Sequence, residues 1–525
     1  MGNYLNPGNS GFEEIRKGTY VDKTGLIRLI NDTIGTKQKL TCVSRPRRFG
    51  KSFAAQMLCA YYDKTCDSSS LFDDLIIAKD IQYTKHLNQY NVIYLDMTNV
   101  IGETALTDIV SYIKRNIVRE LTIAYPELEV AEGLIHTLIN ATALAGNRFI
   151  MIIDEWDSPI REAKDNPQTQ QDYLRFLRTL FKNSSATSQI FAAVYMTGIL
   201  PIKKDGSQSA ISDFREYSIL DPGEYAAFTG FTENEVHVLC DMYHMNFDDA
   251  KNWYDGYSFE NVQSVYNPYS VICAIENGKF KSYWKKSSAS EALLTYIDMD
   301  EDGLQDDIVK LISGEAIEVD TEGFENDVET FRCKDDVLTL LIHLGYLTYA
   351  EEEDGTGTVR IPNKEILMEF NKILRKGKHR ELLRLIRESD YLLEKTIRQD
   401  SKAVAKAIAA IHDSNCSPQF YNDEQALRFV VRFAYITCVD QYYKIEELPS
   451  GHGYADIVYI PKKRALLPAM IIELKWSKTC EGALAQIKDR NYPAVLRDFG
   501  GEVLLVGINY DKNTKLHSCV IEKYF

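Results

Sequence analysis

The segment with the clearest chemical potential is a short basic turn that ends in Gly50-Lys51-Ser52. An apolar run over residues 40–44 precedes this turn, and a helical pattern begins directly after it. Gly50 allows the backbone to approach a phosphate, and the N–H groups at a helix start point toward such an anion. Lys51 can reach the β- and γ-phosphates, and the Ser52 hydroxyl can hold Mg²⁺. The segment therefore predicts a site for a nucleoside triphosphate.

The tripeptide is short, and its surroundings depart from the usual pattern. The spacing G-x-x-x-x-G-K-[ST] would place glycine at position 45, where this chain has Arg45. A basic surface turn without a ligand is therefore the alternative interpretation. A second element favours the nucleotide site, because the apolar run over residues 149–153 ends in Asp154 and Glu155.

An unbroken apolar run is typical of a strand buried on both faces of a parallel sheet, and ligands bind at the carboxyl ends of such strands. There Asp154 would hold Mg²⁺ through water, and Glu155 would orient or activate the attacking water. A further buried pattern over residues 190–196 ends at Thr197, which could sense the γ-phosphate or the water between the two loops. The alternatives are acids that merely begin a loop and a threonine placed there for backbone reasons.

Strand patterns alternate with helical patterns through the first half of the chain, which predicts a doubly wound parallel sheet of the P-loop NTPase type. Aromatic-rich helices over 223–290 predict a lid. A helix followed by a two-strand hairpin within 291–380 predicts a winged-helix-like linker, although its acidic tip argues against DNA contact. The expected domains are 1–222, 223–290, 291–380 and 381–525. The expected strands are 40–44, 92–96, 149–153, 190–196 and, more weakly, 217–220, with helices near 52–63, 104–123, 128–144 and 169–182.

A second group of chemically capable residues lies near the end of the chain. Asp456 begins one strand pattern, and Glu473 and Lys475 share one face of a returning strand because they are two positions apart. In a hairpin the two carboxylates would converge and hold Mg²⁺, while Lys475 would position water or stabilise charge on phosphorus. Glu424 could supply a third carboxylate, and Gln486 could face the same cleft. Exposed charge pairing is the alternative.

Composition limits the remaining possibilities. The chain has 525 residues with a formal net charge of −16, which argues against a general nucleic-acid coat but leaves a local basic groove open. Its ten cysteines show no metal-ligand spacing, so reduced thiols and a cytoplasmic location are expected. The sequence shows no membrane-span-length apolar run and no signal pattern, so no membrane partner is expected.

Five motifs within residues 10–290 resemble a family of bacterial AAA-ATPase-like proteins. In that family an Arg-Pro-Arg-Arg-Phe-Gly-Lys-Ser loop replaces the usual glycine-rich one, which implies that Arg45, Arg47, Arg48 and Phe49 belong to the nucleotide-binding segment. Whether these arginines contact phosphates, contact a neighbouring subunit or form a solvated turn stays open. The motifs are Tyr20-Val21-Asp22-Lys23-Thr24, the loop from Arg45 to Ser52, Ile153-Asp154-Glu155-Trp156-Asp157, Trp253-Tyr254-Asp255-Gly256-Tyr257 and Tyr266-Asn267-Pro268.

Residues 380–525 are similar to the PD-(D/E)XK nuclease superfamily, which implies an α/β restriction-endonuclease-like fold. Tyr454 is a departure, because an arginine often stands there. The resemblance matches Asp456 to the first acid, Glu473 and Lys475 to the E-x-K motif, Gln486 to the helix glutamine, and Glu424 to the acid of the leading helix.

The leading expectation is an ATP- and Mg²⁺-dependent ATPase joined to a Mg²⁺-dependent nuclease. Its expected partner is nucleic acid, with DNA favoured, and a homo-oligomer is left open. The alternative is an ATP-dependent regulatory switch whose C-terminal domain binds nucleic acid or protein without cleaving it. A third class of function is a nuclease with a role in defence or mobile-element biology, such as a toxin-like effector that is held off until it is triggered.

Overall fold

The computed structural model divides into two compact units, each of which is described by itself. The first comprises residues 1–289 and 317–366, and the second comprises 290–316 and 367–525. The expected linker 291–380 thus contributes residues to both units. The structure describes residues 2–163, 166–182, 184–202, 204–205, 208–209, 211, 213–259, 262–284, 303–324, 333–352, 355–376, 380–415, 427–428, 430–431, 434–450, 453–462, 467–490, 492, 496 and 501–524.

A five-stranded parallel sheet forms the centre of the first unit, in the order β2-β3-β4-β1-β7. The α/β fold class and the four main strand predictions are confirmed, and the weaker prediction at 217–220 corresponds to a strand slightly earlier in the chain. The strands are β1 (Leu40–Ser44), β2 (Asn91–Asp96), β3 (Phe149–Asp154), β4 (Phe191–Gly198) and β7 (Arg215–Tyr217).

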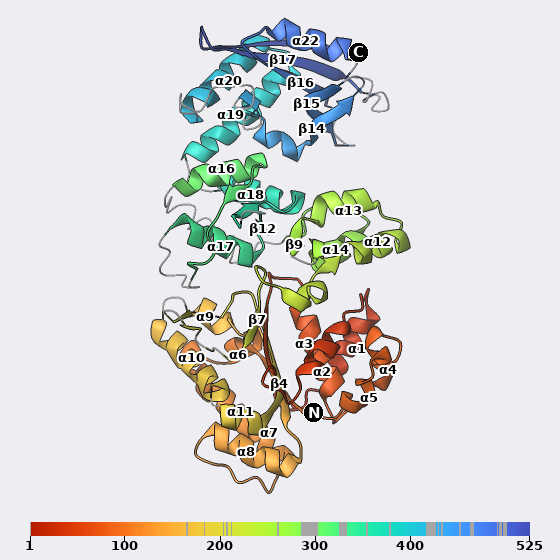
Figure 1. The fold of residues 1–525 in the computed structure, drawn as a ribbon, viewed down its shortest axis with the longest axis vertical. Coiled ribbons are helices and arrows are strands. Elements are labelled where there is room, and N and C mark those ends of the chain that lie inside the picture. The colour runs from red at the N-terminus through yellow and green to blue at the C-terminus, as the bar shows by residue number, and fades with distance from the viewer. Residues whose placement is uncertain are drawn as a thin grey trace. The chain divides into compact units, whose positions relative to one another are not determined.

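Helices cover both faces of this sheet (Figure 1), so alternate strand residues enter two different cores. Ile150 and Ile152 pack on the side of α1 (Ser10–Lys17), α2 (Gly25–Thr33) and α3 (Lys51–Tyr62). Met151 and Ile153 pack on the other side. The helices of that side are α6 (Met97–Glu103), α7 (Ile109–Ala124), α8 (Leu134–Ala145), α9 (Ser158–Glu162), α10 (Pro167–Phe181) and α11 (Ser184–Ile190).

The lid contains helices, as expected, and also a small antiparallel sheet in the order β8-β10-β9 that the sequence did not reveal. Strands of two to five residues are too short to show a clear alternation of apolar and polar positions. The lid elements are η3 (Gly223–Phe228), β8 (Phe231–Thr232), α12 (Glu233–Met242), α13 (Phe247–Tyr254), β9 (Tyr257–Phe259), β10 (Val262–Tyr266) and α14 (Pro268–Asn277).

The predicted helix and hairpin are present as α17 (Lys334–Leu344), β12 (Thr348–Glu351) and β13 (Gly357–Arg360). A third strand, β11 (Ile317–Glu318), pairs with β13. Short elements complete the first unit: α4 (Ser69–Phe72), η1 (Ile76–Lys79), α5 (Tyr83–His86), η2 (Leu106–Asp108), β5 (Lys204–Asp205) and β6 (Gln208–Ser209).

A mixed sheet in the order β14-β15-β16-β17-β18 forms the centre of the second unit; only β16 and β17 run parallel within it. Its strands are β14 (Tyr442–Ser450), β15 (Gly453–Pro461), β16 (Ala469–Trp476), β17 (Val503–Asp511) and β18 (Leu516–Lys523). Its other elements are α16 (Leu304–Ser313), α18 (Lys364–Lys376), which begins in the first unit, and η5 (Ile436–Asp440).

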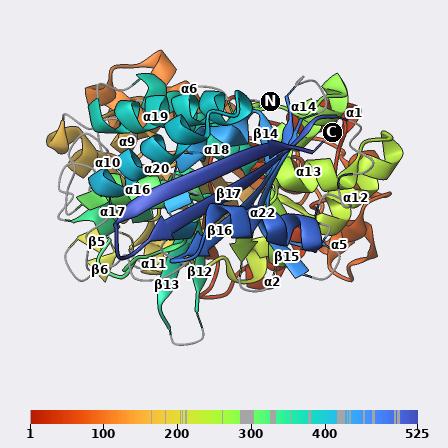
Figure 2. The same ribbon diagram turned by 90° about the horizontal axis from the view of Figure 1, so that it is seen from above.

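Helices also lie on both sides of this second sheet (Figure 2). On one face α19 (Arg380–Ile397) and α20 (Ser401–Asn415) share a core with Ile472 and Leu474. On the other face α22 (Cys480–Asp489) packs against Ile471 and Leu505. Glu473 and Lys475, being odd-numbered like Ile471, therefore lie on the face covered by α22. Within the described parts of the chain, no helix is both long and apolar enough to cross a membrane.

Candidate functional sites

The Gly-Lys-Ser segment lies on a strand-to-helix turn, as predicted. β1 ends at Ser44, and α3 begins at Lys51, directly after Gly50. Gly50 has a φ of 85°, a left-handed conformation that glycine adopts without the steric cost of a side chain. The buried Lys51 side chain folds back over the turn, and its Nζ donates a hydrogen bond to the Pro46 carbonyl at 2.9 Å. The lysine is thereby held at the mouth of the loop.

The two acids at the end of β3 lie beside this turn. The Ser52 side chain lies beside Asp154, and Glu155 Oε1 lies 3.7 Å from Lys51 Nζ. Asp154 is almost fully buried, and this burial raises its pKa to about 7. The structure thus brings together the four residues on which the nucleotide prediction rests.

Thr197 lies at the end of β4. This strand lies between β1, which leads into the Gly-Lys-Ser turn, and β3, which ends in the two acids. It pairs with Val43 of β1, and its carbonyl accepts a hydrogen bond from the Trp156 N–H at 2.9 Å. Its hydroxyl is buried and has no hydrogen-bond partner among the described residues. Thr197 is therefore placed near the acids, with one polar atom still unsatisfied.

The oxygen atoms at this edge of the sheet fit a magnesium ion. Asp154 Oδ1 is buried and accepts no hydrogen bond in the described part of the chain. A buried carboxylate oxygen without a partner is costly, and Mg²⁺ prefers oxygen ligands of this kind. Ser52 and Asp154 could therefore hold the ion. Asp96, which ends β2, instead caps α6 by accepting hydrogen bonds from two backbone N–H groups.

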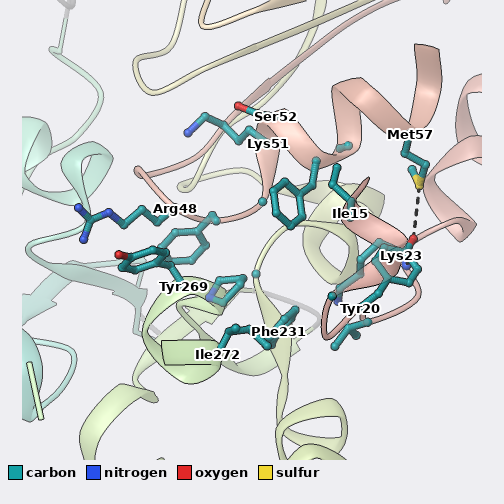
Figure 3. Close-up of a pocket in the computed structure, with 18 of the residues that line it drawn as sticks. Ile15, Tyr20, Lys23, Arg48, Lys51, Ser52, Met57, Phe231, Tyr269 and Ile272 are labelled. Carbon is teal, nitrogen blue, oxygen red and sulfur yellow. Dashed lines mark hydrogen bonds between the residues drawn. The ribbon is translucent and has the colours of Figure 1, made fainter. Parts of the chain in front are cut away.

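A cavity of about 520 Å³ opens beside the turn that contains Gly50, Lys51 and Ser52 (Figure 3). The cavity is lined by the N-terminal lead-in, the loop with the start of α3, the lid, and Glu155 directly after β3. Lys51 and Ser52 lie at one end, and most of the other lining side chains are apolar or aromatic. These side chains include Ile15, Tyr20, Met57, Phe231, Tyr269 and Ile272.

The lid supports the basic turn through several contacts. Arg48 donates a hydrogen bond to the Tyr283 carbonyl at 3.0 Å, and its guanidinium lies 4.6 Å from the centre of the Tyr269 ring. Phe49 is buried edge-to-face against Tyr257, at 5.1 Å between ring centroids. Arg47 is half-buried, and burial lowers its pKa. Arg48 and Phe49 line the cavity, and Arg47 does not.

Arg45 differs from the expectation. Its side chain is fully buried, so it is neither part of a solvated turn nor part of the cavity lining. Its Nη1 donates to the carbonyls of Ser44 and Tyr217, each at 2.9 Å, and its guanidinium packs over the Phe259 ring. Burial lowers the pKa of Arg45 to about 10. These contacts favour a structural role for Arg45 over the phosphate contact that the sequence suggested.

The second candidate site lies in the other unit, where β15 and β16 run antiparallel as expected. Ile457 pairs with Ile472, which places Asp456 beside Glu473. The Leu474 N–H donates to Asp456 Oδ2 at 2.8 Å. Lys475 Nζ lies 2.9 Å from Glu473 Oε1. The hairpin therefore brings the two carboxylates and the lysine together.

Gln486 reaches the same place from α22. Its Nε2 donates hydrogen bonds to Glu473 Oε1 and, at 3.3 Å, to the Tyr492 hydroxyl. The close approach of this helix depends on Gly507, which pairs with Glu473 on the adjacent strand β17. A Cβ atom at Gly507 would lie 2.4 Å from the Cys480 carbonyl oxygen. The glycine thus permits the packing that places Gln486 against the carboxylate.

The Glu473 carboxylate is well suited to holding a cation. Burial, and secondly the nearby Asp456 charge, raise its pKa to about 7, and its Oε2 is buried with no partner among the described residues. The two carboxylates fit a divalent metal. No group of three potential metal-ligating side chains is found in the described ranges, and Glu424, the predicted third acid, lies outside them.

Two arginines near these sites were missed by the sequence analysis. Arg161 contacts Glu155 at 2.7 Å, and its spacing of four residues from Asp157 is a signal that could have revealed it. Arg428 lies 2.6 Å from Asp456 Oδ1. No local pattern connects two residues that are 28 positions apart, so Arg428 could not be found from sequence.

Comparison with known proteins assigns both regions. Residues 7–207 match the family described as predicted AAA-ATPase, and residues 422–518 match the PD-(D/E)XK nuclease superfamily. The chain combines an AAA-ATPase-like region with a PD-(D/E)XK nuclease superfamily region. Both resemblances stated from the sequence are confirmed. An uncharacterised protein encoded in the vnfD 5′ region of Azotobacter chroococcum mcd 1 is 23% identical over 530 residues, covering 96% of each chain.

Solved structures with some similarity include the Aeropyrum pernix ORC2 protein, at 9% identity and a TM-score of 0.26, covering 67% of this chain and 92% of that one. Another is AMPPCP-bound DnaA from Aquifex aeolicus, at 9% identity and a TM-score of 0.23, covering 76% and 96%. These TM-scores are too low to support a fold assignment, so the fold is assigned from the strand topology of this chain.

Proposed function

We propose that the AAA-ATPase-like region binds and hydrolyses ATP. The single observation that carries this proposal is the convergence of Lys51, Ser52, Asp154 and Glu155, of which all but Asp154 line the cavity. The cavity volume and its apolar walls suit a nucleotide base and ribose. The cationic end, at the start of α3, suits the phosphates.

Each residue at the phosphate end has a task that follows from its position. Lys51 would bind the β- and γ-phosphates, together with backbone N–H groups of the loop around Gly50. Ser52 and Asp154 would hold Mg²⁺. Magnesium, when bound, stabilises the negative charge that develops on phosphate oxygens.

Glu155 would act on the attacking water, because its Oε1 faces the lysine end of the cavity. The water oxygen bonds to the γ-phosphorus, the bond to the leaving ADP oxygen breaks, and the proton passes to the Glu155 carboxylate. Thr197 has an unsatisfied hydroxyl close to the acids, which suits a hydrogen bond to the water or to the γ-phosphate.

We also propose that the C-terminal region cleaves nucleic acid, with DNA as the favoured substrate. Asp456 and Glu473 would hold Mg²⁺ beside the scissile phosphate. Lys475, placed 2.9 Å from Glu473, would stabilise the charge on phosphorus, and Gln486 would fix the orientation of Glu473. The unpartnered Oε2 atom of Glu473 supports this arrangement.

The substrate test is incubation of the full chain with plasmid, single-stranded DNA and RNA, each with and without ATP and Mn²⁺. Nicked or shortened nucleic acid in the presence of the metal is the expected result. Intact nucleic acid in every combination would contradict the nuclease proposal. Preference for foreign nucleic acid would point to a defence or mobile-element role. A separate experiment, size-exclusion chromatography in the presence of ATP, tests for a homo-oligomer.

A regulatory switch without cleavage is the second candidate function, and one observation favours it. Asp456 is bound by the Arg428 guanidinium, so this carboxylate is neutralised before any metal arrives. A domain that only binds nucleic acid or protein needs no metal. Retention of DNA without nicking, in the same incubations, would support the switch.

A further inference from the structure

Arg161 forms a compact ionic network with two acids that follow β3. Its Nη2 lies 2.7 Å from Glu155 Oε2, and its Nε lies 2.8 Å from Asp157 Oδ2. The same Nη2 donates to the Ser158 hydroxyl at 2.8 Å. The planar guanidinium can make these bonds at once because its donors form a rigid fork.

Asp157 ties this network to the neighbouring strand. Its carboxylate is 1% exposed and accepts hydrogen bonds from the backbone N–H groups of Ile199, at 3.3 Å, and Leu200, at 3.0 Å. Both residues directly follow β4, the strand that contains Thr197. The Arg161 guanidinium is therefore fixed with respect to the carboxyl ends of both β3 and β4.

The contact with Arg161 engages one carboxylate oxygen of Glu155 and leaves the other on the side of Lys51. Oε2 forms an ion pair with the Arg161 guanidinium, whereas Oε1 lies 3.7 Å from Lys51 Nζ. Glu155 itself has a φ of 53°, so its backbone leaves the strand direction at this point. Glu155 lines the cavity, and Arg161 does not. The arginine can consequently act on a bound nucleotide through Glu155.

We propose that Arg161 is a positioning residue for Glu155: it holds Oε2 so that Oε1 is aimed at the water that attacks the γ-phosphate. This inference rests on the proposed ATPase function. Asp157 serves as the buried anchor of the guanidinium. Because a displaced base loses its alignment with the reacting water, loss of Arg161 reduces the chemical step far more than it reduces nucleotide binding.

The test compares the full-length wild-type chain with Arg161→Met, Arg161→Lys and the control Arg175→Met. Arg175 lies on α10 with its side chain 73% exposed, away from the network. Phosphate release gives kcat and KM for ATP, and a fluorescent ATP analogue gives the dissociation constant. Arg161→Met is expected to lower kcat by about 100-fold, with KM and the dissociation constant changed by less than about threefold.

Arg161→Lys keeps a positive charge between the two acids, so it is the variant expected to fold if Arg161→Met does not. Its single ammonium group cannot reproduce the fork, and kcat is expected to fall by about tenfold, without weaker binding. The control is expected to match the wild type. Two results would overturn the inference and leave the ATPase proposal intact. One is a wild-type kcat in both Arg161 variants. The other is a rise in KM and in the dissociation constant as large as the loss of kcat/KM. Absence of ATP turnover by the wild type would overturn both.

Discussion

The guanidinium of Arg428 lies 2.6 Å from the Oδ1 atom of Asp456, so one of the two carboxylates in the nuclease-like site carries a cation of its own. Any divalent metal at this site must compete with that arginine. We therefore expect Arg428→Met to raise the Mn²⁺ affinity of the full chain by about tenfold, because the competing charge is removed.

Isothermal titration with MnCl₂ measures this change. Arg387→Met, on an exposed position of α19, is the matched control and is expected to bind Mn²⁺ like the wild type. Weaker binding by Arg428→Met would mean that the arginine organises the metal site rather than competing for it. No binding by either protein would favour the regulatory switch.

Lys475→Ala is expected to reduce plasmid nicking by about 100-fold or more, because the proposed site would lose the charged donor that it places beside the scissile phosphate. ATP turnover is expected to stay at the wild-type rate, since Lys475 belongs to the second unit. Supercoiled plasmid with Mn²⁺, resolved on agarose, gives the nicking rate. Lys402→Ala, on an exposed position of α20, serves as the control. Undiminished nicking by Lys475→Ala would show that the site has been placed wrongly.

Gly507→Ala is expected to destabilise the second unit by about 1–3 kcal/mol, because the new methyl group would meet the Cys480 carbonyl oxygen at 2.4 Å. The displaced α22 would also carry Gln486 away from Glu473, so nicking should fall. Urea unfolding followed by circular dichroism measures the stability. Gly482→Ala, on the exposed side of the same helix, meets only the Thr479 hydroxyl and is the control. Equal stability of the two variants would contradict the packing argument.

The buried His343 is expected to lower the free energy of unfolding of the first unit in mild acid. Burial, and secondly the neighbouring Arg45 charge, lower its pKa to about 3. In an unfolded chain the histidine pKa is about 6.5. Between about pH 6.5 and pH 3 the unfolded chain therefore binds a proton at His343 that the folded chain does not bind. The free energy of unfolding consequently falls as the pH falls through this range. At pH 5 the loss is about 2 kcal/mol.

His343→Gln removes this proton uptake, so its unfolding free energy should decrease less than that of the wild type between pH 7 and pH 5. Chemical unfolding of the first unit at the two pH values measures the difference. The control is His136→Gln, at an exposed position of α8, and it is expected to behave like the wild type in this comparison. The same decrease in His343→Gln and wild type would show that His343 does not remain neutral in the folded chain.

The sequence predicted those features that depend on strand patterns and on residues at strand ends. β3 is an unbroken apolar run, and the carboxyl ends of parallel strands meet at one edge, which is why Ser52 and Asp154 could be placed together in advance. The proximity of Asp456 and Glu473 was predicted from two strand patterns joined as a hairpin, and the observed register confirms it. Glu424 stays a prediction, because it lies outside the described residues.

Features that depend on tertiary packing could not be predicted. Arg45 and Arg48 look alike in a run of basic residues, yet one is fully buried under Phe259 and the other lines the cavity. The partner of Asp456, Arg428, is distant along the chain. The short strands of the lid carry too few residues for a period to be recognised.

The most direct test of the central claim is phosphate release from ATP by the full chain, with Mg²⁺ and with EDTA. The wild type is expected to release phosphate only with Mg²⁺, and Lys51→Ala is expected to lose this activity by about 100-fold or more, because the proposal assigns the phosphate contact to Lys51. Lys64→Ala, an exposed lysine just beyond α3, is expected to retain it. Undiminished, Mg²⁺-dependent phosphate release by Lys51→Ala would contradict the assignment of this site.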